Sequence, residues 1–257
     1  MNNTFSLNRF GLLLKKHYFE NIRQYLMSLI VLIGVLILSF VYIIIMMTGG
    51  KQPPTQVQFG VFLTFFLLAG SIFTTGIFSN FAGKSKAIAS LTLPASHLEK
   101  YLLGWFFTVV IFPIIYTSVF YLVNLGILRS FGDTGYSTQM VNVFEKQFRL
   151  VFLIYALFQS IGLCGAIYFQ KFHFIKTAFL FFIIAFVLIT LNTWTIELLI
   201  SEDVRSAMFF NGVRFEQERH RYHINPSGAD TYFNICAGFL IISFWLSAYF
   251  KIKEKQV

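Results

Sequence analysis

The residues whose types and spacing suggest chemistry are few, and the first three are Gly83, Lys84 and Ser85. They spell the end of a phosphate-binding loop, in which backbone N–H groups and a lysine hold nucleotide phosphates. That loop also needs a glycine five residues before Gly83, and this position is Phe78, inside an apolar stretch. No strand precedes it, so we expect no nucleotide to bind to this chain.

Two histidines, His220 and His223, are close enough in sequence to share a metal ion. A structural zinc site takes four ligands, and no third ligand stands at an obvious spacing here. Three arginines lie nearby. We therefore expect a solvated surface, with no metal and no cofactor.

The apolar parts of the chain contain no group for acid–base or nucleophilic chemistry. Their six stretches hold no Asp, Glu, Lys, Arg or His. Ion-coupled transporters usually carry ionisable side chains at membrane depth, and an intramembrane protease needs two aspartates or a nucleophile with a base. We expect neither activity, and no catalytic residue of any kind.

These stretches are long enough to be transmembrane helices, because about 20 apolar residues cross a hydrocarbon core of roughly 30 Å. The chain is 56% hydrophobic and 12% charged, so a soluble fold would have almost no polar surface. We expect an all-α polytopic membrane protein of one domain. The expected spans are 26–47, 58–80, 102–128, 150–169, 177–194 and 232–250.

The charge divides unequally between the two sides that these spans define. The entire formal charge of +9 falls on the side with both termini, whereas the other side is neutral. Basic residues in short loops stay in the cytoplasm. Both termini are therefore predicted to be cytoplasmic, in a cell (inner) membrane, and the high pI indicates contact with anionic headgroups of the bilayer, with no nucleic acid as partner.

Residues 1–25 predict an amphipathic helix that lies in the membrane interface before the chain turns into the first span. Apolar residues recur there at helical spacing, and the polar stripe pairs charges three and four residues apart. The helix either anchors the chain or contacts a cytoplasmic partner. The apolar residues are Phe10, Leu13, Leu14, Tyr18, Ile22 and Tyr25, and the polar stripe contains Lys16, Glu20 and Arg23.

The cytoplasmic segment before the third span carries the clearest local signal. Ser96 followed by Glu99 predicts a capping box, in which each side chain binds a backbone N–H at the start of a helix. Pro94 keeps Leu93 out of helical geometry, so the chain makes a corner there and then continues into the span, where Pro113 is expected to produce a kink. An exposed, rigid corner is a place for another protein to push.

Hydroxyl residues occur on one face of the second span, at Thr64, Ser71, Thr75 and Ser79. The fourth span has a stripe of small residues at Ala156, Ser160 and Cys164. Such patterns are typical of close helix packing, within the chain or with a second subunit. The alternative for the second span is a path for an amphipathic substrate. Outside, in the long loop 195–231, we expect a helix from Ile196 to about Phe210.

These features together resemble the permease subunit of ABC-2 type (type V exporter-like) ABC transporters. The stretch LTLPASHLEKYLLGW, from Leu91 to Trp105, is similar to a segment of small bacterial permeases of this group. The resemblance covers the layout of the whole chain, whereas the motif covers only this stretch. The long polar loop 195–231 departs from better-known exporters of this type and leaves the substrate class open.

The resemblance implies a mechanism and partners. Two permease chains would associate as a homo- or heterodimer, and separate soluble ABC ATPase subunits would dock on their cytoplasmic side. The implied coupling segment contains Leu93, Pro94, Ala95, Ser96, Glu99 and Lys100, and the cargo would be hydrophobic or amphipathic. A non-transporting membrane scaffold or accessory subunit remains the alternative.

Overall fold

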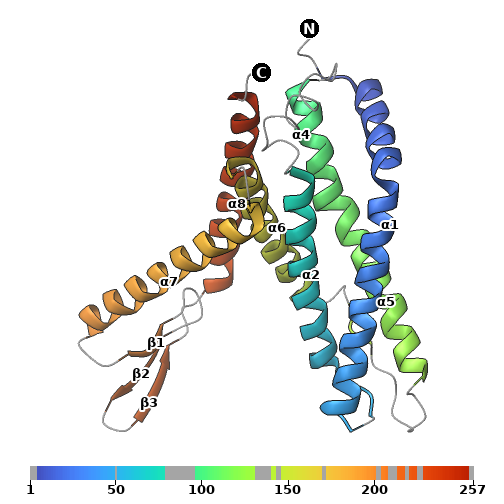
Figure 1. The fold of residues 1–257 in the computed structure, drawn as a ribbon. Helices are drawn as coiled ribbons and strands as arrows, with labels where there is room; N and C mark the ends of the chain where they lie inside the picture. The colour runs from blue at the N-terminus through green and yellow to red at the C-terminus, as the bar shows by residue number, and fades with distance from the viewer. Residues whose placement is uncertain are drawn as a thin grey trace.

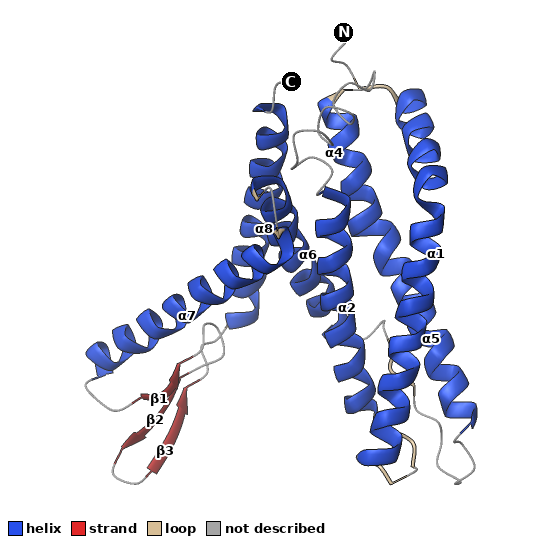
Figure 2. Cartoon of the chain, in the orientation of Figure 1, coloured by secondary structure: helices blue, strands red, loops and turns tan. Residues whose placement is uncertain are grey.

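A computed structural model shows how these elements are arranged. It describes residues 5–49, 51–78, 96–130, 140–142, 146–169, 172–200, 204–207, 213–217, 220–224 and 228–254. Within these residues, six helical segments are long and apolar enough to cross a membrane, as the sequence predicts. The chain is therefore a multi-pass membrane protein built mainly from helices (Figure 2).

The helices alternate in direction, so the start of the first and the end of the last lie at the same end of the molecule (Figure 1). The third span is one rod made of α4, a π-helical segment η2 and α5. The bounds are α1 Leu7–Met46, α2 Thr55–Phe78, α4 His97–Phe106, η2 Phe107–Ile111, α5 Phe112–Ser130, α6 Lys146–Tyr168, α7 His173–Ile200 and α8 Ala229–Glu254.

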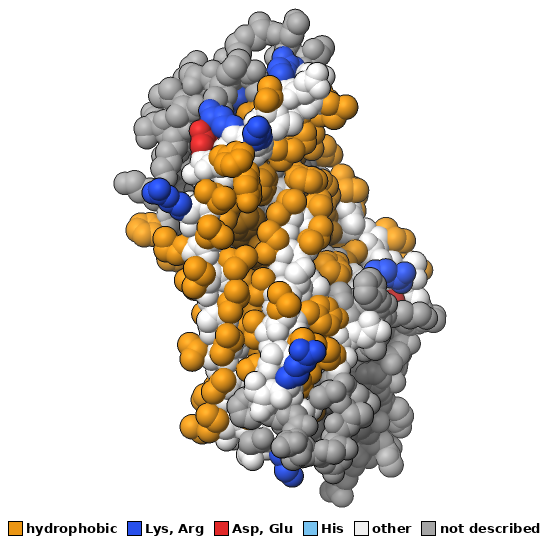
Figure 3. Space-filling model, turned by 90° about the vertical axis from the view of Figure 1, so that its right-hand side faces the viewer, with side chains coloured by type: hydrophobic (Ala, Val, Ile, Leu, Met, Phe, Trp, Pro, Cys, Tyr) orange, Lys and Arg blue, Asp and Glu red, His pale blue; other side chains and the backbone are white. Residues whose placement is uncertain are grey.

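The first helix differs from our expectation, because no turn separates residues 1–25 from the first span. α1 runs without a break for 40 residues, or about 60 Å at 1.5 Å per residue. Since the hydrocarbon core is only roughly 30 Å thick, about half of α1 extends past it. The side of the molecule to which α1 belongs is hydrophobic along most of its length, and several Lys and Arg side chains lie near its upper end (Figure 3).

The apolar stripe of the first turns of α1 packs mainly on protein. Phe10, Leu13, Leu14 and Tyr25 lie against a buried cluster that includes Phe78, Tyr101 and Phe107. Of the other two residues of the predicted stripe, Ile22 is half-buried outside this cluster and Tyr18 is exposed. The contact with α4 explains why the helix stays straight into the span: its apolar side is covered by a neighbouring helix and does not need the membrane surface.

The core of the bundle is aromatic. Phe40 of α1, Phe62 and Phe66 of α2, Tyr116 of α5 and Phe148 of α6 are almost completely buried and meet in one cluster. Ring contacts within it are edge-on or offset, the arrangements that aromatic quadrupoles favour. This packing fixes α1, α2, α5 and α6 as one unit, and α8 covers α6 on the other side (Figure 1).

α7 slants away from this unit (Figure 1), and only 6% of its most apolar window is buried. It approaches α6 closely near its start, where a Cβ added at Gly165 would lie 1.8 Å from Thr177 Oγ1. A side chain at position 165 would therefore displace α7. Beyond this contact, residues on all sides of α7 are exposed, as suits a helix surrounded by lipid.

The helix predicted from Ile196 to about Phe210 is wrong beyond Ile200. The structure instead has three antiparallel strands in the order β1-β2-β3, namely β1 Val204–Ala207, β2 Val213–Gln217 and β3 His220–Ile224. Apolar and polar residues alternate in VRFEQ and HRYHI, the period of a strand. In the register, Phe215 pairs with Tyr222 and Val213 pairs with Ile224.

Candidate functional site

The predicted capping box is present at the start of α4. Ser96 is the N-cap residue with an extended backbone, and its Oγ accepts from Glu99 N at 3.2 Å. In return, Ser96 N donates to Glu99 Oε2 at 2.9 Å. Two N–H groups that the first turn of a helix leaves without partners are thereby satisfied, and the Glu99 side chain is fixed in place.

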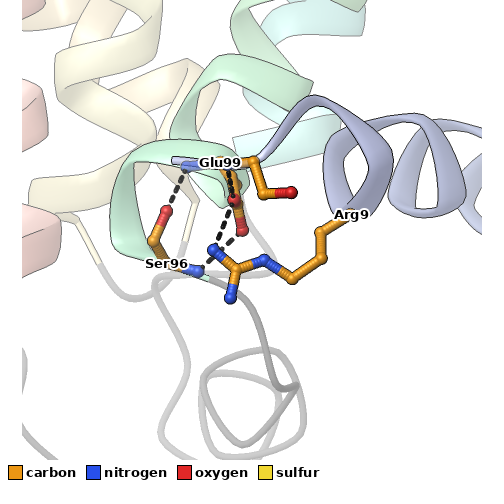
Figure 4. Close-up of polar contacts among 4 residues, drawn as sticks. Arg9, Ser96 and Glu99 are labelled. Atoms are coloured by element: carbon orange, nitrogen blue, oxygen red, sulfur yellow. Dashed lines mark hydrogen bonds and ion pairs between the residues drawn. The ribbon is translucent and has the colours of Figure 1, made fainter. Parts of the chain in front are cut away.

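The other carboxylate oxygen of Glu99 reaches a different helix, which the sequence does not predict. Ser6 N donates to Oε1 at 2.8 Å, and Arg9 Nη2 donates to the same oxygen at 3.1 Å. Ser6 is the N-cap of α1, and its own side chain makes no capping bond. Glu99 therefore caps two helices, 90 residues or more apart in sequence, with one carboxylate (Figure 4).

We call these four residues, Ser6, Arg9, Ser96 and Glu99, the Glu99 junction. Its carboxylate lies at the N-terminal ends of both α1 and α4, where the helix dipoles favour negative charge, and it forms an ion pair with Arg9. Glu99 is 0% exposed. A buried charge with this many donors makes a stiff link between the beginning of the chain and the start of the third span.

The remaining residues of the predicted coupling segment divide into two groups. Leu93, Pro94 and Ala95 lie outside the described residues, so the corner itself is not tested. Lys100 lies in the first turn of α4, is almost fully buried, and donates its backbone N–H to Ser96 O at 3.2 Å. Ser96, Glu99 and Lys100 are thus all buried at one place.

The predicted polar stripe of α1 faces outward. Lys16, Glu20 and Arg23 are exposed, and Lys16 Nζ lies 3.7 Å from Glu20 Oε1, the spacing predicted from sequence. Exposed pairs of this kind contribute little to stability. This stripe is a charged, exposed surface on the N-terminal half of α1.

The predicted hydroxyl face of α2 is described at three of its four positions. Ser71 Oγ donates to Leu67 O at 2.7 Å and Thr75 Oγ1 to Ser71 O at 2.9 Å, so both are satisfied by their own helix. Thr64 is exposed and lines an open groove of about 640 Å³ between α1 and α2, beside Tyr42. Ser79 lies outside the described residues.

A buried polar network in the middle of the bundle was missed from the sequence. Gln159 Nε2 of α6 donates to Thr108 Oγ1 of η2 at 2.9 Å, and Trp245 Nε1 of α8 donates to Gln159 Oε1 at 2.9 Å. Tyr155 of α6 donates to Thr108 O at 2.6 Å. A single glutamine within an otherwise apolar span was the signal, because a polar side chain there needs a partner.

The small residues of α6 pack within the chain, which is one of the two kinds of helix packing predicted for them. Ser160 is buried, and Cys164 Sγ donates to Phe244 O of α8 at 3.0 Å. Both cysteines of the chain are free thiols.

A second junction, made of Gln58 of α2 and Asn124 of α5, lies at the opposite end of the bundle. Asn124 Nδ2 donates to Gln58 Oε1 at 2.8 Å, and Gln58 Nε2 donates to Pro53 O at 2.9 Å. Both residues are buried, but Asn124 Oδ1 has no hydrogen-bond partner among the residues that the structure describes. We call this pair the amide junction.

Within the described part of the chain, no three His, Cys, Asp or Glu side chains are grouped so that they can hold a metal ion. The two histidines His220 and His223 lie in β3, opposite Gln217 and Arg214 respectively. Comparison of the chain with protein-family models, with curated proteins and with solved structures finds no match.

Proposed function

We propose that this chain is the membrane-spanning permease subunit of an ATP-driven ABC exporter, with ATP hydrolysis in a separate soluble subunit. The observation that carries the proposal is the Glu99 junction. The resemblance of Leu91–Trp105 to permeases assigns the coupling segment to the start of the third span, and the N-terminal helix is its neighbour in that scheme. Glu99 joins these two segments through hydrogen bonds to Ser6 and Arg9.

A mechanical role suits this geometry. A force applied at the corner before Ser96 would reach α1 and α4 together, because the carboxylate holds the first turns of both helices. Both helices then continue into the membrane, and α1 does so as one unbroken helix of 40 residues, which can carry movement at the junction across it.

The uncharged spans favour a hydrophobic or amphipathic cargo, since an ionic one needs paired charge at depth. The one-sided charge of +9 favours cytoplasmic termini, and in that orientation the Glu99 junction would lie on the side where ATP is available. The partners we propose are a soluble ABC ATPase and a second permease chain, in the inner membrane of the cell.

The test is to reconstitute the chain in lipid nanodiscs with a candidate ABC ATPase from the same genome and to measure binding and ATP hydrolysis. We expect the ATPase to co-purify and its hydrolysis rate to change. Glu99→Ala should abolish that change, whereas Glu20→Ala, an exposed carboxylate on the same end of the molecule, should preserve it. If no ATPase binds the wild-type chain, the chain is a scaffold or accessory subunit instead.

Orientation has its own test. In a chain with Cys164 and Cys236 replaced by serine, single cysteines at Ser227 and Ser85 should differ in labelling by an impermeant maleimide in intact cells. Position 227 should react and position 85 should not. The reverse pattern would place the Glu99 junction on the outer side and end the ATPase proposal.

A further inference from the structure

The third span is interrupted by a π-helical segment, η2, which leaves the backbone carbonyl of Thr108 without its usual backbone N–H donor. In an α-helix, Thr108 O would accept from the N–H of Phe112. Phe112 N instead donates to Phe107 O, five residues back, as in a π-turn. The next donor along, at position 113, is a proline and has no N–H.

The hydroxyl of Tyr155 solves this problem from outside the helix. It donates to Thr108 O at 2.6 Å, and the side chain is only 3% exposed. Its ring is fixed by stacking on Phe66, with centroids 4.3 Å apart, and on Phe112. A carbonyl that the backbone leaves open is thus satisfied by α6, which matters because an open carbonyl is costly in a membrane interior.

Gln159, one turn further along α6, holds the side chain of the same residue. Thr108 Oγ1 accepts from Gln159 Nε2, and the hydroxyl itself donates back to Gly104 O and Trp105 O. Gln159 is in turn held by Trp245 of α8. Two residues of α6 therefore clamp one residue of η2, and α8 supports the clamp.

Thr108 O consequently has two alternative donors, the Tyr155 hydroxyl in the observed state and the Phe112 N–H in a regular α-helix. We propose that η2 is a register switch in the third span, and that Tyr155 and Gln159 are the latch that holds it in the π state. Release of the latch lets Phe112 N–H move from Phe107 O to Thr108 O. Loss of the π-turn then rotates α4 against α5 by about 100°, the turn of one helical residue.

This device would turn the end of the span that carries Glu99 while leaving the aromatic core around Tyr116 in place. Because it concerns only the chain's own conformations, it stands whether or not an ATPase is the partner. Pro113 contributes by removing the one backbone donor that would make the π state self-sufficient.

The experiment measures the register directly in the full chain in nanodiscs. Spin labels at Leu98 of α4 and Leu122 of α5, both exposed, flank η2 on one rod. Cys164 and Cys236 are replaced by serine, and the distance distribution is recorded by pulsed electron resonance. We expect one narrow distribution for the wild type and a second, shifted distribution in Tyr155→Phe, which keeps the ring but loses the donor.

The chain offers a matched control in Tyr116, whose hydroxyl is also buried and donates to a helix carbonyl, Phe62 O, at 2.9 Å. That carbonyl lies within the regular helix α2, so Tyr116→Phe should leave the distribution unchanged. A label pair on α5 alone, at Ile114 and Leu122, should not move in either variant.

A second variant, Gln159→Met, should produce the same shifted distance as Tyr155→Phe but in a smaller fraction of the molecules. The effect is smaller because the Thr108 hydroxyl keeps its hydrogen bonds to Gly104 O and Trp105 O. If both latch variants retain the wild-type distribution, or if Tyr116→Phe shifts it equally, η2 is a fixed feature of the helix and the proposal is wrong.

Discussion

The Glu99 junction and the amide junction join pairs of helices at opposite ends of the bundle, and they differ in charge and in the number of donors that meet one side chain. The Glu99 carboxylate accepts from Ser6, Arg9 and Ser96 and belongs to helix ends that favour an anion. The amide junction is neutral, and Asn124 Oδ1 has no partner within the described part of the chain. The comparison teaches that the charged junction rests on three donors to one carboxylate, whereas the neutral junction joins its two helices through a single hydrogen bond between amides.

The largest effect should come from removing the charge. Glu99→Ala removes three hydrogen bonds to a buried carboxylate and the cap of two helices, and should lower the free energy of unfolding by about 3 kcal/mol. Unfolding in mixed micelles by denaturant is the measurement. Glu20→Ala, whose ion pair is exposed, should cost less than about 1 kcal/mol. Equal losses in the two variants would mean that the Glu99 junction is not a stiff link between α1 and α4.

A smaller effect is expected at the amide junction. Asn124→Leu removes the donor to Gln58 Oε1 and should cost about 1 kcal/mol, because hydrogen bonds between membrane helices are individually weak. Gln58→Leu combined with Asn124→Leu should lie closer to the wild type than the sum of the single changes. Additive losses in the double variant would show that the two amides are not coupled.

The smallest effect should come from Arg9→Met. The ion pair is lost, but Ser6 N and Ser96 N still donate to the carboxylate. Since the Arg9 side chain is 35% exposed, water and salt screen its charge, and the cost should be about 1 kcal/mol or less. The loss should shrink further as ionic strength rises. A loss as large as that of Glu99→Ala would make Arg9 the main anchor of the junction.

Features that depend on neighbours in sequence were predicted well. The six spans follow from runs of uncharged residues, and the capping box follows from Ser96 and Glu99 three residues apart, because both signals are local. The second role of Glu99, as a cap for α1, depends on a contact across 93 residues and has no local signature. The hydrogen bonds of Glu99 to Ser6 and Arg9 can be recognised only when the positions of α1 and α4 in the fold are known.

Two other differences also have physical causes. The break expected between residues 1–25 and the first span was inferred from amphipathicity, but that apolar face packs on α4 and the helix continues. The strands after Ile200 were missed although VRFEQ and HRYHI alternate with the period of a strand. From the sequence we expect a helix from Ile196 to about Phe210 in the loop and no element over 213–224, whereas the pairing of three short strands decides the outcome.

α7 shows how the chain can be assembled in steps. A helix with so little of its surface buried against the protein gains almost nothing from the rest of the fold, so its stability in lipid comes from its own sequence. It can therefore insert and persist before the other helices have packed. During synthesis, α1 through α6 can complete their aromatic core without waiting for it, and contacts with α6, at Gly165 and between Phe158 and Phe181, then help to set where it leaves the bundle.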